Sequence, residues 1–193
     1  IDTVAYGNVS AITDYVYQEI VFFKNGSDGY TGSIHGGYGN DKIFVYANDV
    51  TINADLSKGH NDRLDIRGDN FTGTVVTGFG HTRVDVRGAG SDIDYTAGAG
   101  RDRVKYRGTA DESIANYDLA DGKNKFEFHG SNSTINLLTG SGSDKVELYG
   151  SDITGDFVLG DGLNTLIVNG VNYTADFTGG ADRDVFKITS QNS

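Results

Sequence analysis

Apolar residues recur along the chain in short runs with a period of two, and these runs follow one another at intervals of about 20 residues. In the run after Asp102, for example, Val104 and Tyr106 are apolar, whereas Arg103 and Lys105 are charged. Alternation of this kind predicts a β-strand that buries one face. We call the residue that precedes each run its marker. The markers are Asp2, Glu19, Asp41, Asp62, Thr82, Asp102, Asn124, Asp144, Asn164 and Asp184.

The spacing and content of these runs indicate a repeat. From Asp41 to Asp184, successive markers are separated by 20, 21 or 22 residues. All twenty positions that lie two and four residues beyond a marker are apolar. Glycine closes most of these strands, as at Gly108 and Gly150, where a tight corner favours a residue without Cβ. A repeat of this length is typical of a solenoid, in which each coil covers the apolar face of its neighbours.

A second apolar strand precedes the later markers, because the residue seven positions before the marker is apolar in six successive coils. These residues are Val75, Tyr95, Tyr117, Leu137, Phe157 and Phe177. The pattern predicts an all-β fold, a right-handed parallel β-helix or β-roll of about ten coils of 20–22 residues, with two strands per coil. It predicts a single solenoid over residues 1–193, less regular in 1–35 and regular in 36–190.

Composition narrows the class of protein. The 193 residues include 28 glycines and no proline, cysteine, methionine or tryptophan, so no disulfide holds the fold. Because no initiator methionine is present, we expect a fragment of a longer protein. No apolar run is long enough for a membrane span. The net charge of −11 argues against a nucleic-acid-binding protein, which is expected to be basic.

One stretch carries a recognisable motif. Residues 36–44, GGYGNDKIF, fit the pattern G-G-x-G-x-D-x-U-x, where U is a large apolar residue, and residues 97–105 and 139–147 keep its G-x-D part. The chain therefore resembles the RTX (repeat-in-toxin) family of β-rolls. That resemblance implies secretion from a bacterium as part of an extracellular toxin, protease, lipase, adhesin or alginate epimerase. The chain departs from the family in two ways: its coil is longer, with the motif at one turn only, and its marker is not aspartate at Thr82, Asn124 and Asn164.

The resemblance also implies calcium binding. Calcium needs six to eight oxygen ligands, which in this family come from glycine-turn carbonyls and motif carboxylates of stacked coils. The residues onto which the resemblance carries this role are Gly37, Gly39, Asp41, Asp62, Asp102, Asp144 and Asp184. Asp41 and Asp62 form the best candidate site, because only there do two motif carboxylates occupy adjacent coils. The alternative is an Asp/Asn ladder that hydrogen-bonds the turns without metal.

Basic residues follow the first strand on its outward side. They stand one and five positions beyond successive markers, with acidic residues between them, except at Lys105. This pattern predicts a cationic track for an acidic polysaccharide or lipopolysaccharide, centred on Arg103, Lys105 and Arg107. The predicted track comprises Arg63, Arg67, Arg83, Arg87, Arg103, Lys105 and Arg107. The alternative is a solvated face on which each coil neutralises its own charge, as exposed ion pairs commonly do.

Two weaker patterns point elsewhere. Thr72, Thr134, Thr154 and Thr174 occupy the outer face of the second strand, as in the flat threonine arrays of ice-binding β-helices, but the row is interrupted and threonine favours strands in any case. His60 and His81 lie near the same turn of consecutive coils, where surface histidines are a simpler interpretation than a metal site.

No catalytic motif is present: the sequence lacks a cysteine nucleophile, a G-x-S-x-G elbow and an H-E-x-x-H pair. We therefore expect a non-catalytic structural and calcium-responsive repeat module of a secreted RTX-like toxin, adhesin or exoenzyme, one that assists folding outside the cell and binds an acidic glycan. Two alternatives stay open, namely a β-helical autotransporter or adhesin passenger and a lyase- or epimerase-type β-helix.

Overall fold

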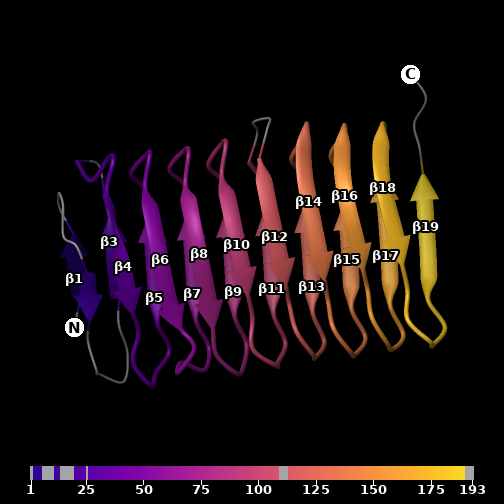
Figure 1. The fold of residues 1–193 in the computed structure, drawn as a ribbon, viewed down its shortest axis with the longest axis horizontal. Helices are drawn as coiled ribbons and strands as arrows, with labels where there is room; N and C mark the ends of the chain where they lie inside the picture. The colour runs from indigo at the N-terminus through magenta and orange to yellow at the C-terminus, as the bar shows by residue number, and fades with distance from the viewer. Residues whose placement is uncertain (1, 6–10, 14–19, 25, 109–112, 190–193) are drawn as a thin grey trace.

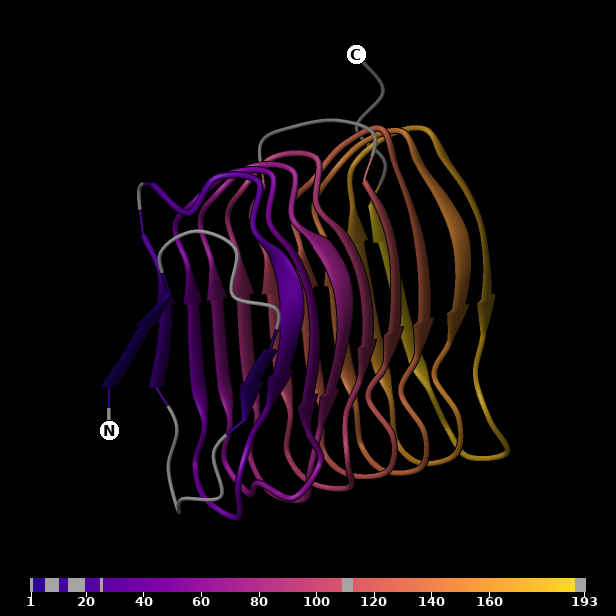
Figure 2. The same cartoon turned by 60° about the vertical axis from the view of Figure 1, so that its left-hand side comes forward.

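Two parallel β-sheets face each other along the whole length of the protein in the computed structural model (Figure 1). The structure describes residues 2–5, 11–13, 20–24, 26–108 and 113–189. The chain alternates between the two sheets, so that each coil adds one strand to each of them (Figure 2). No α-helix occurs in the described ranges, and hence none that could span a membrane.

The first sheet, sheet A, contains the ten strands that follow the markers. They are β1 (Asp2–Ala5), β3 (Ile20–Phe23), β5 (Lys42–Val45), β7 (Arg63–Ile66), β9 (Arg83–Val86), β11 (Arg103–Tyr106), β13 (Lys125–Phe128), β15 (Lys145–Leu148), β17 (Thr165–Asn169) and β19 (Val185–Thr189). Sheet B contains the nine strands between them. They are β2 (Ala11–Thr13), β4 (Thr31–His35), β6 (Thr51–Leu56), β8 (Thr72–Thr77), β10 (Asp92–Thr96), β12 (Ile114–Asp118), β14 (Ser133–Leu138), β16 (Ile153–Val158) and β18 (Tyr173–Thr178).

The predicted parallel β-solenoid is confirmed, with the strand register that the repeat implied. Arg103, for instance, pairs with Arg83 of the preceding coil and Lys125 of the next, so equivalent residues of all coils form continuous rows. The strands make about eight regular turns, slightly fewer than the ten coils predicted. The first two predicted coils include residues 6–10 and 14–19, which lie outside the described residues.

The apolar ladders fill the space between the sheets. From Val21 to Val168, every residue two or four positions beyond a marker is at most 2% exposed. Rings stack along the ladder, with the centroids of Tyr106 and Phe128 4.7 Å apart. The exceptions lie on β19, the last strand of sheet A, where Phe186 is 44% and Ile188 63% exposed. A ladder residue is therefore buried only where a coil stacks on each side of it.

Glycine is favoured in the middle of the solenoid, where successive coils approach each other closely. The glycines two positions before the marker pair directly along the solenoid, from Gly80 through Gly100 and Gly122 to Gly142. A Cβ added at Gly100 would lie 1.8 Å from the carbonyl oxygen of Gly80. A side chain at Gly100 would clash with that carbonyl, so backbone stacking by itself favours the glycine of the G-x-D motif, although His60 and Asp182 occupy the equivalent position in two other coils.

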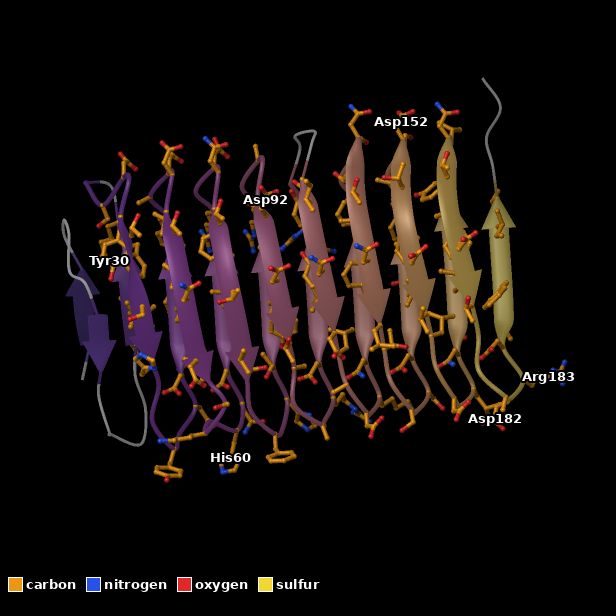
Figure 3. The ribbon with its side chains drawn as sticks, in the orientation of Figure 1. Tyr30, His60, Asp92, Asp152, Asp182 and Arg183 are labelled. Atoms are coloured by element: carbon orange, nitrogen blue, oxygen red, sulfur yellow. The ribbon has the colours of Figure 1, made fainter. Side chains whose placement is uncertain are left out.

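The turn at the opposite edge of the solenoid has a ladder of its own. Its Asp and Asn residues adopt positive φ angles, as at Asp152 (56°) and Asn172 (57°), a conformation that these residue types tolerate. Asn172 Nδ2 donates to Asp152 Oδ1 at 2.8 Å. Figure 3 shows Asp152 at the edge opposite the one that carries His60 and Asp182. Stacked amides and carboxylates thus line both edges, although only one edge carries the glycine motif.

Truncation of a central ladder residue should weaken the whole stack. Phe128 is fully buried, so Phe128→Ala is expected to lower the free energy of unfolding by about 3–5 kcal/mol, the usual cost of a large core cavity. Chemical denaturation followed by circular dichroism measures this. The matched control is Ile114→Ala on sheet B, because Ile114 is 58% exposed. Equal losses for the two variants would contradict the described core.

Candidate functional site

The side chains of the marker row point into the molecule. From Asp41 to Asn164, all seven marker residues are between 1% and 3% exposed, whereas the residues on either side of each marker face solvent or are half-buried. Asp184, before the last strand of sheet A, is half-buried. The motif carboxylates therefore lie beneath the turn, against the edge of the core.

Most marker side chains accept a hydrogen bond from the backbone of the preceding coil. The N–H of Thr82 donates to Asp102 Oδ1 at 2.8 Å, and the N–H of Asp102 donates to Asn124 Oδ1 at 3.0 Å. The same bond recurs at the other described steps from Asp41 onward, with the exception of the step from Asp62 to Thr82. The remaining pairs are Asp41 to Asp62, Asn124 to Asp144, Asp144 to Asn164 and Asn164 to Asp184. We call this row of hydrogen bonds the marker ladder.

The asparagine coils show what the second atom of each marker side chain contacts. Asn124 Nδ2 donates to the carbonyl oxygens of Ala120 at 3.1 Å and Leu119 at 3.2 Å. Asn164 Nδ2 donates in the same way to the carbonyl oxygen of Gly160 at 3.0 Å. Both amides therefore use their oxygen for the backbone N–H of the coil before and their nitrogen for carbonyls of their own turn.

The aspartate coils place an oxygen where the amide nitrogen would be. The Oδ2 atoms of Asp62, Asp102 and Asp144 are buried and have no hydrogen-bond partner among the described residues. A carboxylic acid has the shape of an amide, so a proton on Oδ2 would supply the missing donor. Burial raises the pKa of all three side chains to about 6, which favours this neutral form.

Two oxygen atoms of the predicted calcium site already accept backbone hydrogen bonds. Asp62 Oδ1 already accepts the N–H of Asp41, and the carbonyl of Gly39 accepts the N–H of His60 at 2.9 Å. Within the described residues, no three His, Cys, Asp or Glu side chains gather around a common point, and His60 and His81 join no such group. Calcium binding at Asp41 and Asp62 stays a prediction.

The outward side of sheet A carries most of the positive charge. We define the cationic face as the outward residues of β5 to β15 together with the residue that follows each of these strands. It contains ten Lys and Arg residues against four carboxylates, an excess of six positive charges in a chain of net charge −11. The ten are Lys42, Arg63, Arg67, Arg83, Arg87, Arg103, Lys105, Arg107, Lys125 and Lys145.

The four carboxylates of this face are buried beneath the cations that surround them. Asp85 is 1% exposed, and its carboxylate pairs with Arg87 at 2.9 Å and with Arg107 at 2.6 Å. Although burial raises the pKa of Asp85, the hydrogen bonds from Arg87 and Arg107 outweigh it and hold that pKa well below its ordinary value. Glu127, which is 9% exposed, pairs with Lys105 and with Lys125, and its pKa is lowered to about 2 despite burial.

At the centre of the predicted track, Arg103 and Arg107 form ion pairs with carboxylates that lie outside their own coil. No carboxylate lies between Arg103 and Arg107 on β11, but the neighbouring coils supply them. Arg107 reaches back to Asp85 on β9, and Arg103 approaches Glu127 on β13 at 3.6 Å. Parallel strands of different coils therefore neutralise charges that appear unpaired within one repeat.

Sequence reasoning did not single out Arg101 and Lys123, two cations that stand one position before their markers. The residues one position before the marker include His81, Arg101 and Lys123, all exposed. Together with the row one position after the marker, they line an open groove of about 530 Å³ at the edge of sheet A. The G-x-D motif itself points to this row, because its middle position must face outward when the aspartate points inward.

The outer side of sheet B differs in charge from that of sheet A. Its outward rows contain Asp, Asn, Thr and a few exposed Ile, Leu and Val residues, with Ser33 and His35 on β4, and the described strands β4 to β18 carry no Lys or Arg there. The predicted threonine row is continuous from Thr134 to Thr174, and Thr72 continues it through Thr51 to Thr31, but Asp92 and Ile114 separate the two parts. Neighbouring side chains bond to each other, as Asn136 Nδ2 does to Asn116 Oδ1 at 2.8 Å.

Comparison of the chain with models of protein families, with characterised proteins and with solved structures gave no match.

The buried aspartates should make the fold more stable in mild acid. Their folded pKa of about 6 lies above the ordinary 3.8, so the stability they contribute is present at low pH and is lost as the pH rises through about 6. We expect the free energy of unfolding to be larger at about pH 5 than at about pH 7.5, by on the order of 1 kcal/mol per group, and the thermal unfolding midpoint to be correspondingly higher. Circular dichroism at the two pH values measures this difference.

The matched control is the triple variant Asp62→Asn, Asp102→Asn, Asp144→Asn. Asparagine keeps both the acceptor and the donor that Asn124 already provides, so the variant should fold and lose most of the pH difference. A wild-type chain that becomes more stable between pH 5 and pH 7.5, or a triple variant with the same pH profile as wild type, would count against the buried-acid ladder.

Calcium binding at Asp41 and Asp62 has a separate test. If calcium binds only the folded chain there, the unfolding midpoint of the chain at about pH 7.5 should be higher in millimolar calcium than in excess chelator. The free energy of unfolding should rise by about 2.7 kcal/mol at a calcium concentration one hundred times Kd. Asp41→Asn should abolish the rise, and Asp102→Asn should leave it. Identical midpoints with calcium and with chelator would leave the marker row as a hydrogen-bonded ladder alone.

Proposed function

We propose that this chain is a non-catalytic structural module of a secreted bacterial RTX-like toxin, adhesin or exoenzyme, and that its cationic face binds an acidic polysaccharide or lipopolysaccharide. The observation that carries the proposal is the excess of six positive charges on one face of an acidic chain. Such a segregated field attracts polyanions to that face and repels them from the rest of the molecule.

The buried carboxylates support binding because they fix the cations in place. The side chains of Arg67 and Arg87 are 45% and 40% exposed, while the carboxylates that they contact, on Asp65 and Asp85, are at most 1% exposed. Each guanidinium is therefore held from below and keeps other N–H groups directed at solvent. Side chains ordered in this way lose less conformational entropy when they bind a ligand.

The same carboxylates favour binding over the lyase or epimerase alternative. A polysaccharide lyase or epimerase needs a base whose pKa lies near the working pH. Asp85 and Glu127 have lowered pKa values because cations surround them, so each is a weak base. The calcium-responsive part of the proposal rests on the sequence resemblance and depends on the calcium experiment described above.

Binding to the cationic face should be sensitive to salt and to the outer guanidinium groups. We expect polygalacturonate to bind in low salt and to dissociate as ionic strength rises, because exposed charges are screened over about 8–10 Å. The variant Arg67→Gln, Arg87→Gln should bind about tenfold more weakly, since exposed charge contacts contribute up to about 1 kcal/mol each. Asp65 keeps Arg63 at 3.0 Å and Asp85 keeps Arg107, so the fold should persist. Isothermal titration calorimetry measures both effects.

The matched control is Arg183→Gln, Lys187→Gln, which removes two exposed cations outside the cationic face. Its affinity should equal that of the wild-type chain. If wild-type chain shows no binding in low salt, or if both double variants lose affinity equally, the cationic face is a solvated surface and the proposal is wrong.

A further inference from the structure

The groove beside the cationic face runs across four successive coils. Its walls come from the residues immediately before and after the markers, because both project outward when the marker points inward. Its floor includes Thr82, Asp102 and Asn124, all at most 3% exposed. The lining residues on the two walls are His81, Arg83, Arg101, Arg103, Lys123, Lys125, Ser143 and Lys145.

The charge in this groove is almost entirely positive. Six Lys and Arg residues line it, and the single carboxylate is that of Asp102, which is 1% exposed and belongs to the marker ladder. Arg101 and Lys123 are exposed and have no ion pair among the described residues, unlike Arg103 and Lys125 on the opposite wall. Within the groove, these two side chains are therefore the cations most available to an external anion.

The groove repeats its charges at the spacing of the coils. Arg101 and Arg103 stand on opposite walls in one coil, and Lys123 and Lys125 stand in the same positions in the next. Adjacent parallel strands are about 4.8 Å apart. A ligand that lies along the solenoid axis thus meets a pair of cations in each of the two central coils and one Lys or Arg in each outer coil, which suits a linear polymer with one acidic group per unit rather than an isolated anion.

We propose that this groove binds a linear polyuronate, with carboxylates of successive sugars between the paired cations of successive coils. The inference rests on the proposed function and names the place and the ligand class more closely. Guanidinium and ammonium groups form charge-assisted hydrogen bonds with carboxylates. Single-stranded nucleic acid fits the groove less well, because no Phe, Tyr or Trp lines it to stack bases.

The test uses galacturonate oligomers of increasing length, titrated into the chain by calorimetry in low salt. Affinity should rise with length until the oligomer spans the four coils that line the groove, and then level off. Arg101→Gln, Lys123→Gln should lower the affinity for the hexamer about tenfold. Arg101→Lys, Lys123→Arg should retain it, and so should the control Arg183→Gln, Lys187→Gln. Circular dichroism should show the fold intact, because Arg101 and Lys123 are exposed.

The outcomes separate this inference from the proposed function. If Arg67→Gln, Arg87→Gln weakens binding while Arg101→Gln, Lys123→Gln does not, the cationic face binds the glycan and the groove inference is overturned. Absence of any binding by the wild-type chain would overturn both. Equal binding of methyl-esterified oligomers, affinity independent of length, or tighter binding of a single-stranded oligonucleotide of equal charge would each overturn the polyuronate assignment.

Discussion

Backbone stacking between coils is the constraint on which the rest of this structure depends. Each coil must lie one strand spacing from the next, so every position of the repeat becomes a row of equivalent side chains along the solenoid. Rows of apolar residues close the core, rows of glycine allow the carbonyl of one coil to approach the next, and rows of Asp and Asn bond the turns together. A residue is acceptable at a position only if it can pack beside the residues that occupy the same position in the two adjacent coils.

Because equivalent residues form rows, charged residues of one sign collect on one face of the solenoid. Like charges in adjacent coils would repel each other. On sheet A, buried carboxylates lie between the rows of cations and reduce this repulsion. Sheet B collects uncompensated aspartates and amides that bond along the rows. The molecule consequently has one basic and one acidic side, although its net charge is strongly negative. The net charge of the chain therefore does not indicate the charge that a ligand meets at the basic side.

The marker ladder shows how a motif can be kept for packing. Asp and Asn exchange at this position because both offer an acceptor to the coil before, and a protonated Asp offers the same donor as Asn to its own turn. The isolated bridges between motif glycines need only backbone contact. Coil stacking therefore accounts for both the glycine and the aspartate of the G-x-D sequence, whether or not an ion binds at Asp41 and Asp62.

The sequence by itself determined the repeat, the two strands of each coil and the buried ladders, because side chains that alternate within a strand and recur every 20 to 22 residues can share one core only by stacking. It also identified Arg63 to Arg107 as an outward basic row. It could not show that Asp85 pairs with Arg107 or that Glu127 pairs with Lys105, since these partners belong to different coils and meet only across parallel strands. Nor could it show which way Asp102 points: burial of that side chain, and with it the groove between Arg101 and Arg103, depends on how tightly the turn folds against the coil before it.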